Sequence, residues 1–263
     1  MQNTTSAGFM EIMTIMRRLR GSGGCPWDAE QSHESLKRYL LEESYEVLEA
    51  IDSNNDELLK EELGDLLLQP VFHAAIAEER GAFTIDDIMQ TLADKLIRRH
   101  PHVFGDEQIA DSEAQVANWE KIKKTEKGEE RRSALSGVPP HLPALMKAHK
   151  ITEKAARVGF DWEHVDQVMA KVIEELHEFE EAMAEGSQAR MEAELGDLLF
   201  ALVNLGRFIA IDPEEALRKT IARFQRRFEF IEATLHIQNK SLQSSTLDEM
   251  EYLWSEAKKQ ESD

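Results

Sequence analysis

The hexapeptide E-L-G-D-L-L occurs twice in this chain, at residues 62–67 and at residues 194–199, which are 132 positions apart. The similarity extends upstream at the same offset, where residues 40–50 match residues 172–182. Acidic positions coincide between the two copies in this alignment, and a tryptophan precedes each copy. Such self-similarity at one offset indicates an internal duplication, so the fold is expected to contain two related modules.

The composition predicts that both modules are helical. The chain has only 13 Gly and 7 Pro in 263 residues, whereas the strong helix formers Glu, Leu, Ala, Lys and Met are abundant. We therefore expect an all-α fold of tandem helical modules. We place the modules at residues 9–124 and 145–261, joined by a proline-containing linker at 125–144.

The charge excludes several classes of function. Lys and Arg number 31 against 51 Asp and Glu, so the formal net charge is −20. A charge of this sign opposes generic binding to nucleic acid or to an anionic membrane. No apolar run reaches the roughly 18 residues of a membrane span, and no basic-then-apolar targeting segment opens the chain. The single cysteine, Cys25, fits a reducing compartment, so we expect a soluble cytoplasmic protein.

Two glutamates in each copy are expected one helical turn apart beside the core. On a projection at about 100° per residue, Glu175 and Glu178 border the apolar arc, and the small Ala182 lies between them. Glu174 projects further from this arc. The counterparts in the first copy are Glu43, Glu46 and Ala50, with Glu42 in the outer position.

The helix that follows in each copy is apolar on nearly every side, which is typical of a buried helix. In the second copy only Glu194, Asp197 and Asn204 form a polar stripe, and in the first copy the stripe consists of Glu62, Asp65 and Gln69. Burying carboxylates is costly unless they are protonated, paired or bound to a metal. If the two helices pack antiparallel, four carboxylates converge, and their oxygens favour Mg²⁺ or Mn²⁺ over zinc. The alternative is a solvated acidic face, which the recurrence within an apolar helix disfavours.

Basic residues recur as well, at helical spacings of i, i+3 and i+4. Such a fork suits phosphate oxygens, although ion pairs or the helix dipole account equally well for any single residue. A tryptophan followed four residues later by a lysine could stack on a base and contact a phosphate, with simple packing as the alternative. The basic trios are Lys95, Arg98 and Arg99, and Arg223, Arg226 and Arg227; the tryptophan–lysine pairs are Trp119 with Lys123, and Trp254 with Lys258.

Taken together, these motifs resemble the MazG nucleoside triphosphate pyrophosphohydrolases over nearly the whole chain. The motifs are G-C-P-W-D at 24–28, E-E-x-x-E at 42–46 and 174–178, both E-L-G-D-L-L copies, R-R-H-P-H-V-F at 98–104 and W-x-x-x-K at 254–258. The resemblance implies an all-α fold whose four-helix cores are completed by dimerisation, and hence a homodimer. It also implies Mg²⁺-dependent cleavage of nucleoside triphosphates to monophosphate and pyrophosphate, by water attack on the α-phosphorus, in a broad-range enzyme that controls the nucleotide pool.

The resemblance also assigns roles to residues by matching position. The implied metal ligands are Glu175, Glu178, Glu194 and Asp197 in the second copy, and Glu43, Glu46, Glu62 and Asp65 in the first. The implied nucleotide contacts are Lys171 together with the basic trios and the tryptophan–lysine pairs. Glu174, or Glu42 in the first copy, lies outside the ligand pair and is the candidate general base.

The two copies differ in ways that favour the second as the catalyst. Pro70 follows Asp65 by five residues and predicts a kink in a helix that should run straight past the metal site. Ala201 stands where the first copy has Gln69, and Ala193 replaces Glu61. Two other functions stay open: an all-α pyrophosphohydrolase restricted to one nucleotide, such as dUTP or phosphoribosyl-ATP, and a helical module that senses nucleotides without turnover.

Overall fold

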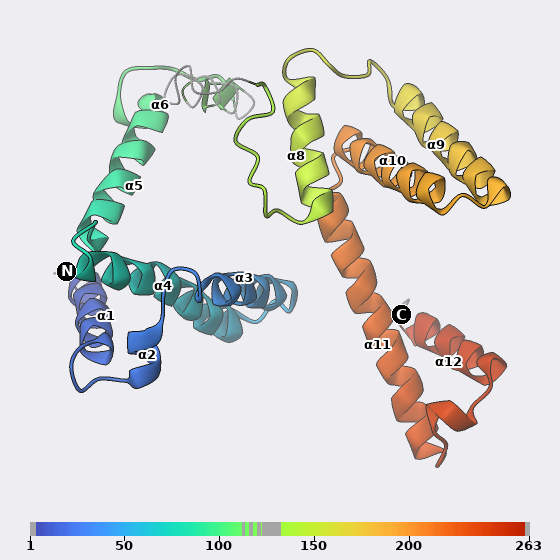
Figure 1. The fold of residues 1–263 in the computed structure, drawn as a ribbon, viewed down its shortest axis with the longest axis horizontal. Coiled ribbons are helices and arrows are strands. Elements are labelled where there is room, and N and C mark those ends of the chain that lie inside the picture. Colours follow the sequence, from blue (N-terminus) through green and yellow to red (C-terminus); the bar gives the residue numbers. More distant parts are fainter. Residues whose placement is uncertain (1–3, 112–113, 116–117, 120–121, 123–132, 261–263) are drawn as a thin grey trace. The chain divides into compact units, whose positions relative to one another are not determined.

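The computed structural model describes residues 4–111, 114–115, 118–119, 122 and 133–260. Every secondary-structure element of these residues is a helix (Figure 1), which confirms the all-α prediction. The chain divides into two compact units, Met1–Glu126 and Lys127–Asp263. Within the described ranges, no helix combines the length and apolar character that a lipid bilayer requires of a span.

The first unit is built around two long helices that pack against each other, α3 and α4. Asn54 has a left-handed φ of 51°, and the Asn55 side chain accepts hydrogen bonds from the backbone N–H groups of Glu57 and Leu58, which caps α4. The chain therefore reverses in a short turn. The helices of this unit are α1 (Thr4–Arg20), α2 (Pro26–Glu30), α3 (Lys37–Asp52), α4 (Asp56–Glu79), α5 (Ile85–Arg99) and α6 (Pro101–Phe104).

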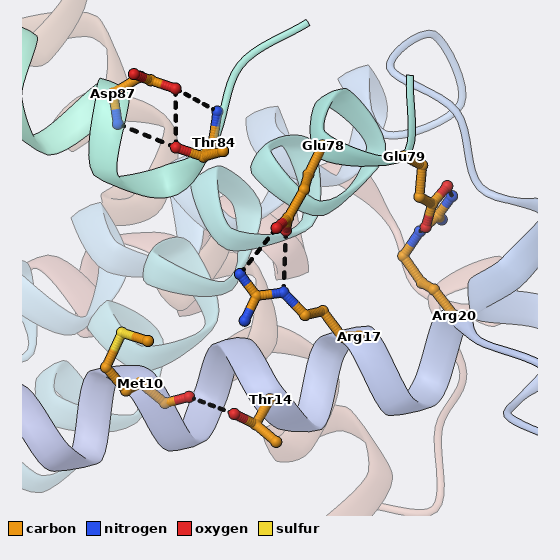
Figure 2. A network of polar contacts seen from close by, with 8 residues as sticks. All are labelled: Met10, Thr14, Arg17, Arg20, Glu78, Glu79, Thr84 and Asp87. Atoms are coloured by element: carbon orange, nitrogen blue, oxygen red, sulfur yellow. Dashed lines mark hydrogen bonds and ion pairs between the residues drawn. The ribbon is translucent and has the colours of Figure 1, made fainter. Parts of the chain in front are cut away.

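The core of the first unit lies between α1 and the second half of α4. Met13, Met16, Val71 and Ala75 are buried there. Figure 2 shows ion pairs between the same two helices, in which guanidinium groups of α1 contact carboxylates of α4. The Arg17 Nε lies 3.0 Å from Glu78 Oε2, and the Arg20 Nε lies 2.7 Å from Glu79 Oε1; beside them, Thr84 and Asp87 form the capping box of α5.

Pro70 does not interrupt α4, which continues as α-helix from Asp56 to Glu79. The proline removes one backbone donor from the helix. Pro70 itself lies on an exposed face of the helix. Any distortion at Pro70 thus leaves the helix intact on both sides of the acidic positions.

The second unit contains a closely packed helical hairpin, α9 and α10. Gly186 has a left-handed φ of 71° and, with Ser187, forms the two-residue connection that turns the chain back on itself (Figure 1). α8 packs against α10 and α11, and α12 packs against α11. The elements are α8 (Ala144–Ala156), α9 (Val165–Glu185), α10 (Gln188–Phe208), α11 (Pro213–Ile237), the 3₁₀ turn η2 (Leu242–Ser244) and α12 (Leu247–Gln260).

Within one chain, α10 is buried only in part. Val203 and Ala201 are buried, but Leu195, Leu199 and Leu202 remain 44–47% exposed. Apolar residues occur on nearly every side of α10, but one chain covers only some of these sides. An apolar surface of this kind commonly marks an interaction site.

Candidate active site

In the second unit, three carboxylates converge where α9 packs on α10. Glu175, Glu194 and Asp197 each offer an oxygen, and these oxygens all lie within 4.8 Å of one another. Glu175 is buried at 6% exposure, whereas Asp197 is exposed. Glu178 interacts electrostatically with this cluster. Partial burial raises the pKa of its carboxyl group, and the negative charges of Glu175 and Glu194 raise it further.

The first unit repeats this arrangement where α3 packs on α4. The carboxylate oxygens of Glu43, Glu62 and Asp65 lie within the same 4.8 Å limit. Burial raises the pKa of Glu43, and the neighbouring charges of Asp65, Glu46 and Glu62 raise it further. The antiparallel packing of the helices therefore brings three of the four predicted acidic residues of each copy within 4.8 Å of one another, and the fourth, Glu46 or Glu178, interacts electrostatically with members of the cluster.

Both clusters have the chemistry of a site for a hard divalent cation. The donors are carboxylate oxygens, which Mg²⁺ and Mn²⁺ prefer. Burial raises the pKa values of Glu43 and Glu178, and repulsion from the neighbouring carboxylates raises them further; a bound cation would relieve this repulsion. The residues present thus fit a divalent metal.

Lys171 of α9 stands beside the second cluster and contacts two of its acids. Its Nζ lies 2.8 Å from Glu174 Oε1 and 2.7 Å from Glu175 Oε1. Hydrogen bonds to both carboxylates raise the pKa of this ammonium group, which stays charged. Glu174, the candidate base, and Glu175, a candidate ligand, are thereby held by one cation. In the first unit Glu42 is exposed on α3, and Tyr39 stands in the place of Lys171.

A cavity of about 550 Å³ opens beside the second cluster, between α8, the turn at residues 159–162, α9 and α10. Lys171, Glu175 and Asp197 lie in its wall. Most of the remaining wall is apolar, so the cavity has both charged and apolar lining residues. A volume of this size is typical of sites for small molecules, which run from roughly 300 to 1,000 Å³.

Sequence reasoning missed a polar chain in the wall of this cavity. Arg207 donates from Nη1 and Nη2 to both oxygens of Asp161, at 2.9 and 2.5 Å, and from Nε to Asn204 Oδ1 at 3.0 Å. The bonds from Arg207, followed by the backbone N–H of Trp162, hold the pKa of Asp161 below its ordinary value. The polar stripe of α10 already contained Asn204, but nothing local pointed to Asp161, which lies 46 residues from Arg207.

The predicted basic contacts of the second copy lie on α11 and α12. The guanidinium of Arg227 lies over the Trp254 ring at 5.4 Å, and Phe224 packs on the same ring at 5.0 Å. Among the described residues that line the cavity, none belongs to α11 or α12. One chain therefore does not bring this basic group to the cavity. The group consists of Arg223, Arg226, Arg227, Trp254 and Lys258.

The basic contacts predicted in the first copy lie mainly on α5. Lys95, Arg98 and Arg99 occupy its last two turns, and α5 packs against α4 and α6. Trp119 is 37% exposed, and Lys123 lies outside the described residues.

Comparison with known proteins identifies the family of this chain. A family model described as the MazG nucleotide pyrophosphohydrolase domain matches residues 31–104 and 163–230, so it matches twice. The chain belongs to the MazG family. Each MazG segment contains one acidic cluster: the first segment spans α3 to α6, and the second spans α9, α10 and most of α11.

Several known proteins are similar to nearly the whole of this chain. The nucleoside triphosphate pyrophosphohydrolase/pyrophosphatase MazG of Thermotoga maritima is 48% identical over 250 residues, which cover 95% of both chains. The nucleoside triphosphate pyrophosphohydrolase of Escherichia coli K12 is 45% identical over 96% of this chain and 97% of its own length. The uncharacterized protein YabN of Bacillus subtilis is 50% identical over 96% of this chain, which spans 52% of that protein.

Proposed function

We propose that this MazG chain hydrolyses nucleoside triphosphates to monophosphate and pyrophosphate, and that the second unit performs the reaction. The observation that carries the proposal is the convergence of Glu175, Glu194 and Asp197 within 4.8 Å at the wall of a 550 Å³ cavity. Relatives that match nearly the whole chain at 45–48% identity carry the name of this activity, which supports the assignment.

Four carboxylates of the second unit would hold Mg²⁺, with Mn²⁺ as a substitute: Glu175, Glu178, Glu194 and Asp197. When bound, the metal offsets the triphosphate charge and lowers the pKa of a water molecule. Glu174, which forms an ion pair with Lys171, is the proposed base and would accept the proton of the water that attacks the α-phosphorus. The bond from the α-phosphorus to the bridging oxygen then breaks, and pyrophosphate leaves with the electron pair.

Lys171 has a second role in this proposal. Its ammonium group has three donors, and two of them bond to Glu174 and Glu175. The same ammonium group lies in the cavity wall, where it can meet a phosphate oxygen. The other proposed nucleotide contacts are the basic residues of α11 and α12, with those of α5 and Trp119 and Lys123 for the first copy.

We further propose a homodimer, because apolar side chains of the hairpin are left exposed within one chain. Leu195, Leu199 and Leu202 of α10 and Leu176 of α9 are each more than 40% exposed. A second hairpin packed on this face would complete a four-helix core. The module limits 9–124 and 145–261, and a location in the reducing cytoplasm, also remain part of the proposal.

The test is a panel of the common ribonucleotides and deoxyribonucleotides, including dUTP, and phosphoribosyl-ATP, each assayed with and without Mg²⁺. Pyrophosphate and orthophosphate are separated as products. We expect pyrophosphate and monophosphate in equal amounts, from several nucleotides, only with Mg²⁺. Turnover of a single nucleotide would instead favour a specific enzyme, and tight binding without turnover would favour a nucleotide sensor.

The second unit is tested by removing one candidate ligand. Asp197→Asn should lower kcat for pyrophosphate release about 100-fold or more, because an amide cannot replace a charged ligand, while helicity by circular dichroism stays unchanged. The matched variant is Asp65→Asn, in the equivalent position of the first unit, which should retain most of the activity. A loss confined to Asp65→Asn would assign the reaction to the first unit.

A further inference from the structure

Asn204 presents a donor of fixed orientation to the cavity beside the second acidic cluster. Its Oδ1 accepts a hydrogen bond from Arg207 Nε at 3.0 Å. Because the oxygen and nitrogen of an amide point apart, this bond directs the Asn204 NH₂ group away from Arg207. Asn204 lies in the cavity wall, so its two N–H donors are the groups that it offers to a ligand.

Arg207 is itself held firmly, which fixes the amide in turn. Both of its terminal nitrogens donate to Asp161, in the fork geometry that gives arginine–carboxylate pairs their directional strength. The Arg207 and Asp161 side chains are only 13% and 27% exposed. This pairing neutralises the charge of the guanidinium, so the wall presents a neutral amide rather than a cation at this point.

The apolar part of the cavity wall suits a flat, weakly polar group. Phe160 and Trp162 line the cavity beside Ile151 and Ala155 of α8. Aromatic and aliphatic surface of this kind favours a ring system over a phosphate, which Lys171 and a divalent metal held by the acidic cluster would attract. A nucleotide has the same polarity, with a base at one end and charged phosphates at the other.

The first unit has different side chains at the corresponding positions. At the offset of 132 that aligns the two hexapeptides, Phe72 stands for Asn204 and Ala75 for Arg207. Phe72 is 3% exposed, and Trp27 packs edge-on against both Phe72 and Tyr39, with ring centroids 6.4 and 5.8 Å away. Where the second unit has an amide facing a cavity, the first therefore has packed rings.

We propose that this cavity is the nucleobase site of the second unit and that Asn204, positioned by Arg207 and Asp161, donates a hydrogen bond to a ring nitrogen or carbonyl of the base. The inference rests on the proposed function for the placement of the triphosphate at Glu175 and Asp197. Asn204 is then a specificity-determining residue, whereas Arg207 and Asp161 are positioning residues. The first unit, by this reasoning, holds no base in the same way.

Asn204→Asp tests the donor, because the two side chains have nearly the same shape and Arg207 can still bond to one oxygen. The second oxygen now faces the acceptor of the base, so we expect the KM for nucleoside triphosphates to rise about 10-fold or more, with a smaller effect on kcat. Inhibition by tripolyphosphate, which has no base, should change less than about 2-fold. The same substitution at the exposed Asn239 is the control for the added charge.

Binding without turnover separates this inference from the proposed function. Calorimetric titration of the full chain with AMP, CMP, GMP and UMP should show affinity for at least one of them, reduced about 10-fold by Asn204→Asp but not by Asn239→Asp. Such a result in a chain that releases no pyrophosphate would refute the proposed reaction and retain the base site. Equal affinities in the wild type and Asn204→Asp would overturn the base site even in an active enzyme.

A double-mutant cycle tests the positioning pair. Asp161→Asn removes the charge that holds Arg207, so we expect a smaller increase in nucleotide KM, again without effect on tripolyphosphate. If Asp161 acts through Asn204, the increase should disappear in the Asn204→Asp background. Additive increases in KM, or equal losses for nucleotide and tripolyphosphate, would show that Asp161 only stabilises the fold.

Discussion

Glu175 is buried at 6% exposure, and Lys171 forms an ion pair with its carboxylate. Lys171→Gln should therefore lower the free energy of unfolding by about 1–2 kcal/mol without Mg²⁺. This is less than the cost of breaking a fully buried ion pair, because Lys171 itself is partly exposed. Added Mg²⁺ should restore most of this loss. The control is Lys219→Gln, which removes a solvent-screened ion pair with Glu215 and should have a much smaller cost. Urea denaturation measures both, and equal costs would contradict the role of Lys171.

His33 and His73 form a hydrogen-bonded histidine pair outside the acidic clusters. Arg80 can only donate, so His33 accepts its hydrogen bond at Nε2 and places its own proton on Nδ1, which lies 2.7 Å from His73 Nδ1. His73 must then accept and stay neutral. Burial, followed by the charge of His33, accordingly lowers the pKa of His73 from its ordinary value of 6.5.

The lowered pKa makes stability depend on pH. The unfolded chain binds a proton at His73 as the pH falls through 6.5, whereas the folded chain resists it, so stability is lost below that pH. We expect the free energy of unfolding to fall between pH 7.5 and 5.5, and His73→Gln to reduce this slope. His236→Gln, at an exposed position of α11, should leave the slope unchanged. An identical slope in both variants would exclude His73 as the source.

Two glycines of the α9–α10 hairpin provide an element-scale test, because the same substitution should have opposite effects at them. Gly186 ends α9 with φ 71°, a conformation that costs an L-residue roughly 1–2 kcal/mol, whereas Gly196 lies within α10. An added Cβ meets nothing within 4 Å at either site. Gly186→Ala should thus destabilise the chain by about 1 kcal/mol, and Gly196→Ala should stabilise it by about 0.5–1 kcal/mol. Thermal unfolding without Mg²⁺ measures both, and a destabilising Gly196→Ala would reveal a packing role for that glycine.

The whole molecule is expected to be a dimer in solution, because one chain leaves the apolar hairpin face uncovered. Sedimentation equilibrium should give a mass near twice 30.1 kDa. Leu202→Glu puts a charge on that face and should shift the population to monomer, whereas Ile237→Glu, at the 80% exposed end of α11, should not. A wild-type chain that sediments as a monomer would refute the proposed four-helix core.

Helix class, duplication and the acidic clusters were predictable because their signals are local. Spacings of three and four residues place Glu175 and Glu178 on one helix face whatever surrounds them. The hexapeptide repeat then identifies the partner carboxylates, and the two-residue turn at Gly186 leaves antiparallel packing as the only arrangement of the hairpin. The basic face of α11 was equally visible in the sequence, but a local pattern could not say whether one chain brings it to the acids, and the structure does not.

The sequence by itself thus determined that this protein is helical, doubled and acidic at matched positions, since each of these properties follows from residues close together along the chain. The tertiary structure alone decided that a cavity opens beside one cluster, because its walls come from α8, a turn, α9 and α10, and because Asp161 and Arg207 meet across 46 residues. It also decided that Asn204 of the second unit borders this cavity, whereas its counterpart Phe72 is buried. Trp27 and Trp162 each precede one copy of the repeat, so the sequence does not distinguish their environments. In the structure Trp27 packs against Phe72, whereas Trp162 lines the cavity.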